Sequence, residues 1–150
     1  MKLTDYMNQT LADLNQMLML TYQIHWYMRG ERFLHLHPML DDYIEEYQEA
    51  IDEIAEKNII IGGTPLSTLE EMVEHSTLKF EKGNYDLTMN DQLAKLLDGL
   101  KHMETVFHQG FEIAEDEGKQ AIADVYTDLE ASTAKHIWMI NAELGRSARA

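Results

Sequence analysis

The sequence predicts an all-α fold, a four-helix bundle with a short helix in a long crossover between helices two and three. Apolar residues recur at helical spacing in four segments of roughly 25 residues. Glycine and proline mark most of the breaks, and one of the three connections is far longer than the other two. Because no repeat or change of composition divides the chain, residues 1–150 are expected to form a single domain.

The first two helices are defined by apolar stripes and by the residues at their ends. The first is predicted from about Thr4 to Met28, stopping near Gly30, and the second from Pro38 to Gly62-Gly63. The first stripe consists of Met7, Leu11, Leu14, Leu18, Thr21, His25 and Met28. The second consists of Leu40, Ile44, Tyr47, Ile51 and Ile54. Residues at these spacings share one side of a helix, so both helices are expected to face a common core.

The rest of the chain is predicted to hold one short helix and two long ones. Ser67 and Glu70 match a capping box, which predicts a short helix ending near His75. The third long helix is expected from about Asn90 to Glu117, with the fourth close behind it. Their inward residues are Leu93, Leu96, Leu100, Met103, Phe107 and Phe111, then Ile122, Val125, Leu129, Ile137, Ile140 and Leu144.

The longest connection decides the topology. Antiparallel neighbours need only ~2–8 connecting residues. The segment from Gly63 to Met89 is much longer, and it can carry the chain back along a bundle ~35–40 Å long. The second and third long helices are therefore expected to run parallel, as in a ferritin-like bundle with one long crossover. A cytokine bundle would need two such crossovers.

Composition limits the classes of function. The formal net charge of −15 repels nucleic acid and attracts cations, although an acidic surface that serves solubility alone is the alternative. The absence of cysteine rules out disulfides and thiolate metal sites. No apolar run approaches the ~20 residues that span a bilayer, and no signal-peptide pattern opens the chain. A cytoplasmic protein without a membrane partner is expected.

The histidines argue against an iron site inside a single bundle. Such sites use a Glu-x-x-His motif on two helices. None of the seven histidines has Glu three residues before it, and the His-Glu-x-x-His motif of zinc proteases is also absent. Any iron site must therefore use another arrangement.

Another set of metal-binding side chains lies along the first two helices. His25 lies near the end of the first helix and His37 just before the second, whereas Asp41, Asp52 and Glu56 lie on the second. These carboxylates share a sector ~60° wide, more than ~100° around the helix from the apolar stripe. They are expected to point out of their own bundle and to share a metal with histidines only across an interface. A solvated acidic face beside a core histidine is the alternative.

Residues 22–66 closely resemble the Dps family. The family pattern has a His-Trp-Tyr, a second His twelve residues later, an Asp fifteen further on and a Glu four after that. This chain matches it with His25, His37, Asp52 and Glu56, and with Gly62-Gly63-Thr64-Pro65 after the helix. A looser similarity continues into the last helix, at residues 135–139.

The resemblance implies a homo-oligomeric shell of twelve subunits, with ferroxidase centres at its two-fold interfaces. His25 and His37 would come from one chain, and Asp52 and Glu56 from its mate, with two iron ions at each site. Members of the family oxidise Fe(II), preferably with hydrogen peroxide, and store ferric oxyhydroxide inside the shell. An enzyme that protects the cell from oxidative damage is therefore expected, and imidazole and carboxylate ligands suit iron.

Three further residues flank these ligands. Asp41 is a candidate additional metal ligand, with an exposed acid as the alternative. His35 is interpreted as an incidental loop histidine. Trp26 is a candidate electron donor to a stalled oxidant, with packing beside the site as the alternative.

Acidic residues also cluster where the third long helix turns into the fourth. They are Glu115, Asp116, Glu117, Asp124 and Asp128. By resemblance this region lines negatively charged three-fold pores, for which Glu117, Asp124 and Asp128 are the candidates. Such a ring would concentrate cations, and a solvated charge run is the alternative.

The chain departs from family members that bind DNA through a mobile tail rich in Lys and Arg. Lys2 is the only base before Arg29, and the C-terminal segment offers only Arg146 and Arg149. The sequence therefore argues against direct DNA binding. Two other functions stay open: a non-catalytic metal-buffering or structural shell, with zinc or manganese in the site, and a four-helix interaction module with packed histidines.

Overall fold

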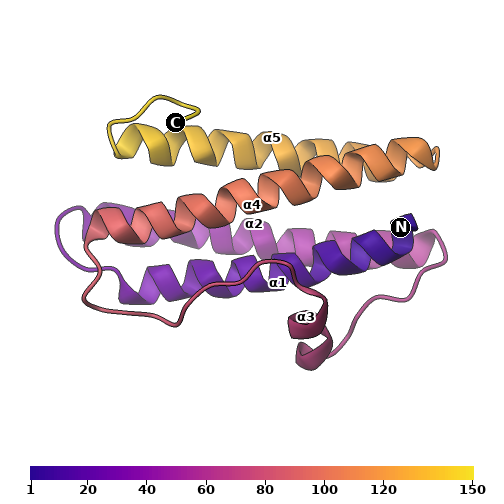
Figure 1. Ribbon diagram of the computed structural model, residues 1–150, viewed down its shortest axis with the longest axis horizontal. Coiled ribbons are helices and arrows are strands. Elements are labelled where there is room, and N and C mark those ends of the chain that lie inside the picture. The colour runs from indigo at the N-terminus through magenta and orange to yellow at the C-terminus, as the bar shows by residue number, and fades with distance from the viewer.

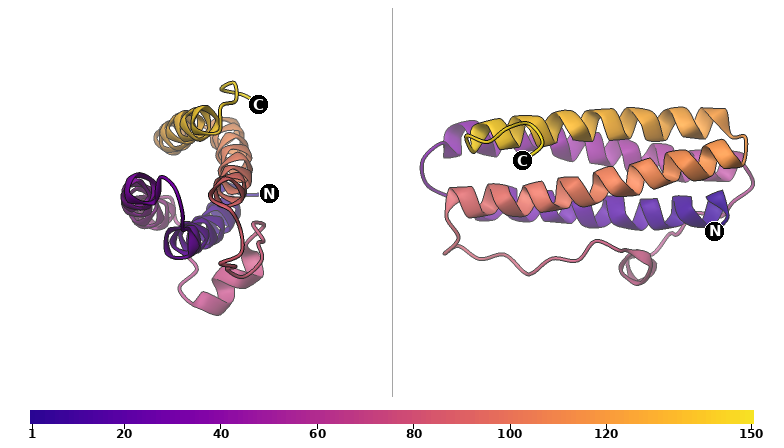
Figure 2. Two further views of the ribbon diagram at one scale, coloured as in Figure 1. Left: turned by 90° about the vertical axis from the view of Figure 1, so that its left-hand side faces the viewer. Right: turned by 45° about the horizontal axis from the view of Figure 1, so that its top comes forward.

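The computed structural model describes residues 1–150 and contains helices joined by loops, without strands. The helices are α1 (Leu3–Tyr27), α2 (Phe33–Ile60), α3 (Leu69–His75), α4 (Met89–Asp116) and α5 (Gln120–Glu143). The four long helices lie alongside one another, and α3 lies outside them against α1 (Figures 1 and 2). The predicted four-helix bundle with a short helix in the crossover is therefore confirmed.

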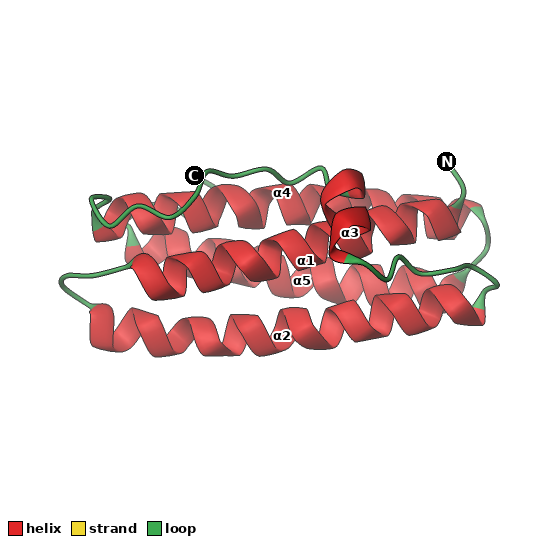
Figure 3. Ribbon diagram, turned by 90° about the horizontal axis from the view of Figure 1, so that it is seen from below, coloured by secondary structure: helices red, strands yellow, loops and turns green.

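The long connection between α2 and α4 sets the direction of the helices. It leaves α2 at one end of the bundle, forms α3, and returns as a loop to the other end, where α4 begins (Figures 1 and 3). As a result α2 and α4 run in the same direction, as predicted. No helix combines the length and the apolar composition that crossing a bilayer requires.

The core is one cluster of 31 buried residues contributed mainly by the four long helices. The predicted stripes face inward, with five of their members only partly buried at the margin of the core: Leu18, Ile51, Phe111, Leu129 and Leu144. The hydrophobic effect on this shared apolar surface is what holds the amphipathic helices together.

The predicted start of α2 was wrong. The helix begins at Phe33 instead of Pro38, so His37 lies inside α2 and not before it. The main-chain carbonyl of Arg32 accepts two N–H groups of the additional turn, at 3.1 and 2.8 Å. Pro38 has no N–H to donate to the carbonyl of Leu34, and Leu34 is an exposed residue, so water can take the place of that bond.

The predicted cap of α3 was wrong by one residue. Thr68 is the N-cap and accepts the N–H of Glu71 at 3.2 Å, while the Glu71 carboxylate accepts the N–H of Ser67 at 3.2 Å. Both Ser and Thr are favoured at the N-cap, with Ser somewhat preferred. The observed register places Met72 of α3 against the bundle core, and this tertiary contact decides between two neighbouring cap residues.

A buried carboxylate in α1 anchors the crossover. Asp13 is fully buried and accepts hydrogen bonds from the Ser76 hydroxyl at 2.7 Å and from the Thr77 N–H at 2.6 Å. It also accepts the Thr77 hydroxyl at 2.7 Å and the Leu78 N–H at 3.0 Å. Four donors compensate for the burial of one charge, so Asp13 fixes the path of the loop after α3.

Candidate metal centre

His25 in the last turn of α1 and His37 in α2 lie against each other. Their rings are parallel, with 3.6 Å between centroids and 9° between planes. The Nδ1 atom of each ring lies 2.8 Å from the main-chain carbonyl oxygen of the other residue. Two reciprocal hydrogen bonds therefore join the end of α1 to the start of α2.

These bonds determine the tautomer of both rings. A carbonyl oxygen can only accept a hydrogen bond, so Nδ1 must carry the proton in each histidine. In the neutral form of each ring, the free electron pair then lies on Nε2. Metal-binding histidines are commonly oriented in this way, with one nitrogen bonded to a carbonyl and the other on the metal.

Asp41 joins the histidine pair. Its Oδ1 lies 3.5 Å from the Nε2 of His25, and its side chain is 65% exposed, whereas that of His25 is 11% exposed. Asp41 follows His37 by four residues, which places both on one face of α2. A recessed imidazole therefore presents Nε2 toward an exposed carboxylate of the same chain.

Asp52 and Glu56 lie on the same helix but at a different place. Asp52 is fifteen residues after His37, which is about 22 Å along a helix axis. Both carboxylates are exposed, which confirms that they point away from their own core. The structure thus brings together His25, His37 and Asp41, and leaves Asp52 and Glu56 apart from them. Within one chain, no group of three or more His, Cys, Asp or Glu side chains is placed to hold a metal ion.

Two aromatic residues lie near the histidines in the sequence, and one of them contacts the pair. Phe33, the first residue of α2, stacks on His37 with 4.8 Å between centroids. Trp26 is 55% exposed and stacks on Tyr22 at 5.1 Å. His35 is exposed in the first turn of α2, so its assignment to a loop was wrong because the helix starts earlier than predicted.

The candidate pore residues are exposed, and two of them have partners within the chain. The carboxylate of Glu117, just after α4, accepts the N–H of Leu3 at 2.6 Å and so caps the start of α1. Asp124 accepts a hydrogen bond from Gln120 at 3.0 Å. Asp128 lies one turn further along α5 on the same face.

Sequence reasoning missed a polar network between α2 and α5. The carboxylate of Glu46 accepts hydrogen bonds from Ser132 and from the Nε2 of His136, the latter at 2.6 Å, and the Tyr43 ring stacks on His136 at 4.0 Å. Burial raises the pKa of Glu46, but the hydrogen bonds of His136 and Ser132 outweigh it, so the pKa lies below its ordinary value. Burial and the nearby Glu46 raise the pKa of Tyr43. The i, i+4 spacing of Ser132 and His136 was the available signal.

Comparisons with known proteins identify the family. The model of the ferritin-like domain matches residues 4–150. A DNA protection during starvation protein of Streptococcus suis is 40% identical over 143 residues, covering 95% of this chain and 83% of the relative. Its counterpart from Listeria monocytogenes is 36% identical over 143 residues, covering 95% and 92%. The chain belongs to the Dps family.

Solved structures of Dps proteins agree closely with this fold. Dps from Listeria monocytogenes superposes with a TM-score of 0.97 at 35% identity, covering 100% of this chain and 97% of that one. Listeria innocua Dps soaked with cobalt gives a TM-score of 0.97 at 35% identity, covering 100% and 96%. The Dps fold is therefore conserved across the whole chain.

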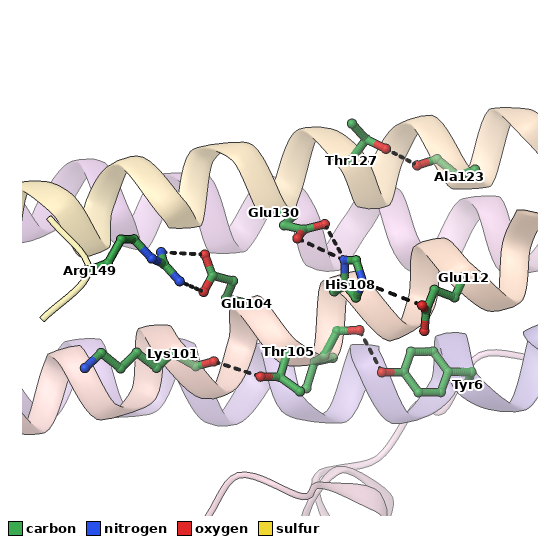
Figure 4. Close-up of polar contacts among 11 residues, drawn as sticks. Tyr6, Lys101, Glu104, Thr105, His108, Glu112, Ala123, Thr127, Glu130 and Arg149 are labelled. Carbon is green, nitrogen blue, oxygen red and sulfur yellow. Dashed lines mark hydrogen bonds and ion pairs between the residues drawn. The ribbon is translucent and has the colours of Figure 1, made fainter.

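A second missed cluster joins α4, α5 and the C-terminal segment (Figure 4). The Nδ1 of His108 lies 3.1 Å from Glu130, and its Nε2 lies 3.6 Å from Glu112. Arg149 binds both carboxylate oxygens of Glu104, at 2.8 and 3.1 Å. The His108–Glu130 contact joins α4 to α5, and the Arg149–Glu104 ion pair ties the C-terminal segment of this Dps chain to α4.

Proposed function

We propose that this protein is a ferroxidase and iron store: it oxidises Fe(II), preferably with hydrogen peroxide, and holds the ferric oxyhydroxide inside a shell of twelve copies. The observation that carries the proposal is the locked histidine pair, in which neither Nε2 takes part in the reciprocal bonds and that of His25 lies 3.5 Å from the carboxylate of Asp41. This activity would remove both reactants that generate hydroxyl radicals and so protect the cell from oxidative damage.

The proposed site is shared between two copies of the chain. His25, His37 and Asp41 of one copy supply one half, and Asp52 and Glu56 of the other supply the second half. The separation of about 22 Å along α2 supports this division, since one chain cannot bring its own two halves together. In Listeria innocua Dps, a solved variant replaces by glycine two histidines that are twelve positions apart, the spacing of His25 and His37.

The donor set suits the chemistry. Neutral imidazoles and carboxylates bind Fe(II), and the harder carboxylates favour the Fe(III) product. Two Fe(II) ions at one site each lose one electron, and peroxide takes up both electrons and two protons as its O–O bond breaks to give two waters. Because both electrons reach peroxide at one site, the one-electron reduction of peroxide, which releases hydroxyl radical, is avoided. Trp26, exposed beside the site, is the proposed donor when only one iron is present.

The proposal also covers the entry of iron, the cellular compartment and the relation to DNA. Residues 1–150 are proposed to form one domain. The proposed pores of the shell are lined by Glu117, Asp124 and Asp128, whose negative charge would concentrate cations. The cytoplasm is the proposed compartment. Although the relatives are named for DNA protection, the net charge of −15 favours protection through iron chemistry over direct DNA binding.

Anaerobic stopped-flow mixing of the assembled protein with Fe(II), then with peroxide or with dioxygen, tests this function. We expect oxidation to be faster with peroxide. Replacing His25 and His37 by Ala should slow oxidation more than about tenfold, the loss that even outer-shell changes at metal sites produce. A His35→Ala variant is the matched control, because His35 is exposed on the same helix and contacts neither ring.

The outcomes separate the candidate functions. If the double alanine variant oxidises iron as fast as the wild type, the site assignment is wrong. If the wild type binds metal but peroxide drives no oxidation, the protein is a metal-buffering shell that holds zinc, manganese or iron without turnover. A native mass of twelve times the 17.4 kDa chain is expected, and a stable monomer that still oxidises iron would contradict the shared site.

A further inference from the structure

Arg32, just before α2, has an unusual backbone conformation. It is the one residue other than glycine with a positive φ, at 70°, and its ψ of 5° places it in the left-handed region. Side chains with a Cβ disfavour this region, and glycine adopts it freely. Glycine would therefore meet the backbone requirement better, which points to a role for the arginine side chain.

The guanidinium of Arg32 joins three parts of the bundle. It donates to Glu143, the last residue of α5, at 3.2 Å and to Asn90, the second residue of α4, at 2.6 Å. The α1–α2 loop, the start of α4 and the end of α5 meet at the same end of the bundle (Figure 1). The planar guanidinium can hold two acceptors at once, in a geometry that the ammonium of lysine does not reproduce.

The same residue is coupled to the histidine pair. Its main-chain carbonyl accepts the N–H groups of the first turn of α2, at 3.1 and 2.8 Å. Phe33, the next residue, stacks on His37, and His37 stacks on His25 with 3.6 Å between centroids. A continuous set of contacts therefore runs from α4 and α5 through Arg32 and Phe33 to the two rings.

We propose that Arg32 is a positioning residue for the metal site. Its guanidinium fixes the left-handed turn against α4 and α5, and the turn sets the first residues of α2 so that His37 lies over His25. This inference rests on the proposed metal-binding role of the two histidines. It gives the loop between α1 and α2 a function beyond connecting two helices.

Cobalt(II) titration of the assembled protein, followed by visible absorption, tests the proposal. The band positions report ligand geometry, and the titration reports affinity, without any turnover. We expect Arg32→Gly to weaken cobalt binding about tenfold and to alter the bands, as loss of outer-shell partners does. Its unfolding midpoint should stay close to that of the wild type, because the backbone strain that glycine relieves offsets the two lost guanidinium contacts. Arg149→Gly, which removes the ion pair with Glu104, should leave both the affinity and the spectrum unchanged.

A second variant separates positioning from folding. Glu143→Gln keeps Arg32 in place but weakens one of the two guanidinium contacts that hold the turn. It should therefore reduce affinity in the wild-type background and have no effect in Arg32→Gly. If Arg32→Gly does not assemble, the cobalt titration of Glu143→Gln is the test. Cobalt affinity and a spectrum equal to those of the wild type in Glu143→Gln would then overturn the inference. If the wild type binds cobalt no better than the variant without His25 and His37, the proposed site itself fails. If the histidines are required but Arg32→Gly behaves as the wild type, only the role of Arg32 is wrong.

Discussion

His25 and His37 each donate their Nδ1–H to the main-chain carbonyl of the other, at 2.8 Å in both directions. This reciprocity makes the two histidines part of the structure as well as candidate ligands. It closes the gap between α1 and α2, and it leaves both Nε2 atoms free. The roles of the two nitrogens in each ring can therefore be separated by substitution.

Replacing His37 by Asn should remove metal binding while the fold is kept. The Asn side-chain amide lies near the position of Nδ1, so it can still donate to the carbonyl of His25, but nothing replaces Nε2. We expect the unfolding free energy to change by less than about 1 kcal/mol and cobalt affinity to fall more than about tenfold. Thermal unfolding and metal titration check the two effects. Wild-type affinity in His37→Asn would show that Nε2 is not the ligand.

The hydrogen bonds of Glu46 should make the free energy of unfolding fall as the pH is lowered into the acid range. The pKa of Glu46 is lower in the folded chain than its ordinary value of 4.5, so the unfolded chain binds the proton more tightly. Its stabilisation is complete above the ordinary pKa and is lost as pH falls through the lower folded pKa. Glu46→Gln should cost about 1–3 kcal/mol at neutral pH and flatten the loss of stability below about pH 5.

Urea unfolding at several pH values, at one protein concentration, measures this effect. The control is Glu45→Gln, which changes an exposed neighbour on the same helix. Parallel pH curves for the wild type and Glu46→Gln would show that Glu46 has no depressed pKa in the folded protein.

Asp13→Ala should release the crossover before it unfolds the bundle. The substitution leaves the hydrogen-bond donors of residues 76–78 without their acceptor. Each donor that stays buried and unpaired costs about 1–3 kcal/mol of stability. We expect faster hydrogen exchange and proteolysis at residues 76–88, with the α4–α5 pair still protected. Asp5→Ala, an exposed acid on the same helix, is the control. Unchanged exchange in this segment would mean that Asp13 does not hold the loop.

The helical pattern was sufficient to predict the bundle, because stripes at i, i+3 and i+4 specify both the helices and their inward faces. The start of α2 was not predictable from local signals, since it depends on the left-handed turn at Arg32 and on Phe33 packing against His37. The Glu46–His136 network depends on which helices are neighbours in space. Spacing correctly placed Asp52 and Glu56 outside their own core, but it grouped Asp41 with them, whereas Asp41 lies beside His25.

The assembled protein should not retain DNA. Binding to DNA depends on Lys and Arg side chains that neutralise phosphates and release counterions. With a net charge of −15 per chain, acidic side chains far outnumber these basic ones. We expect no mobility shift of plasmid DNA in metal-free buffer at moderate salt. A clear shift that weakens as salt is added would reveal a basic patch formed only in the shell.

Co-assembly of two inactive variants tests the shared site most directly. One variant carries His25→Ala and His37→Ala, and the other carries Asp52→Ala and Glu56→Ala. Each shell alone should oxidise Fe(II) slowly with peroxide, because every interface lacks half of its ligands. After the two are dissociated and reassembled together, a mixed dimer has one site with all its ligands and one that lacks all four substituted ligands, so activity should partly return. If mass measurement confirms mixed shells and no activity returns, the division of the site between two chains is wrong.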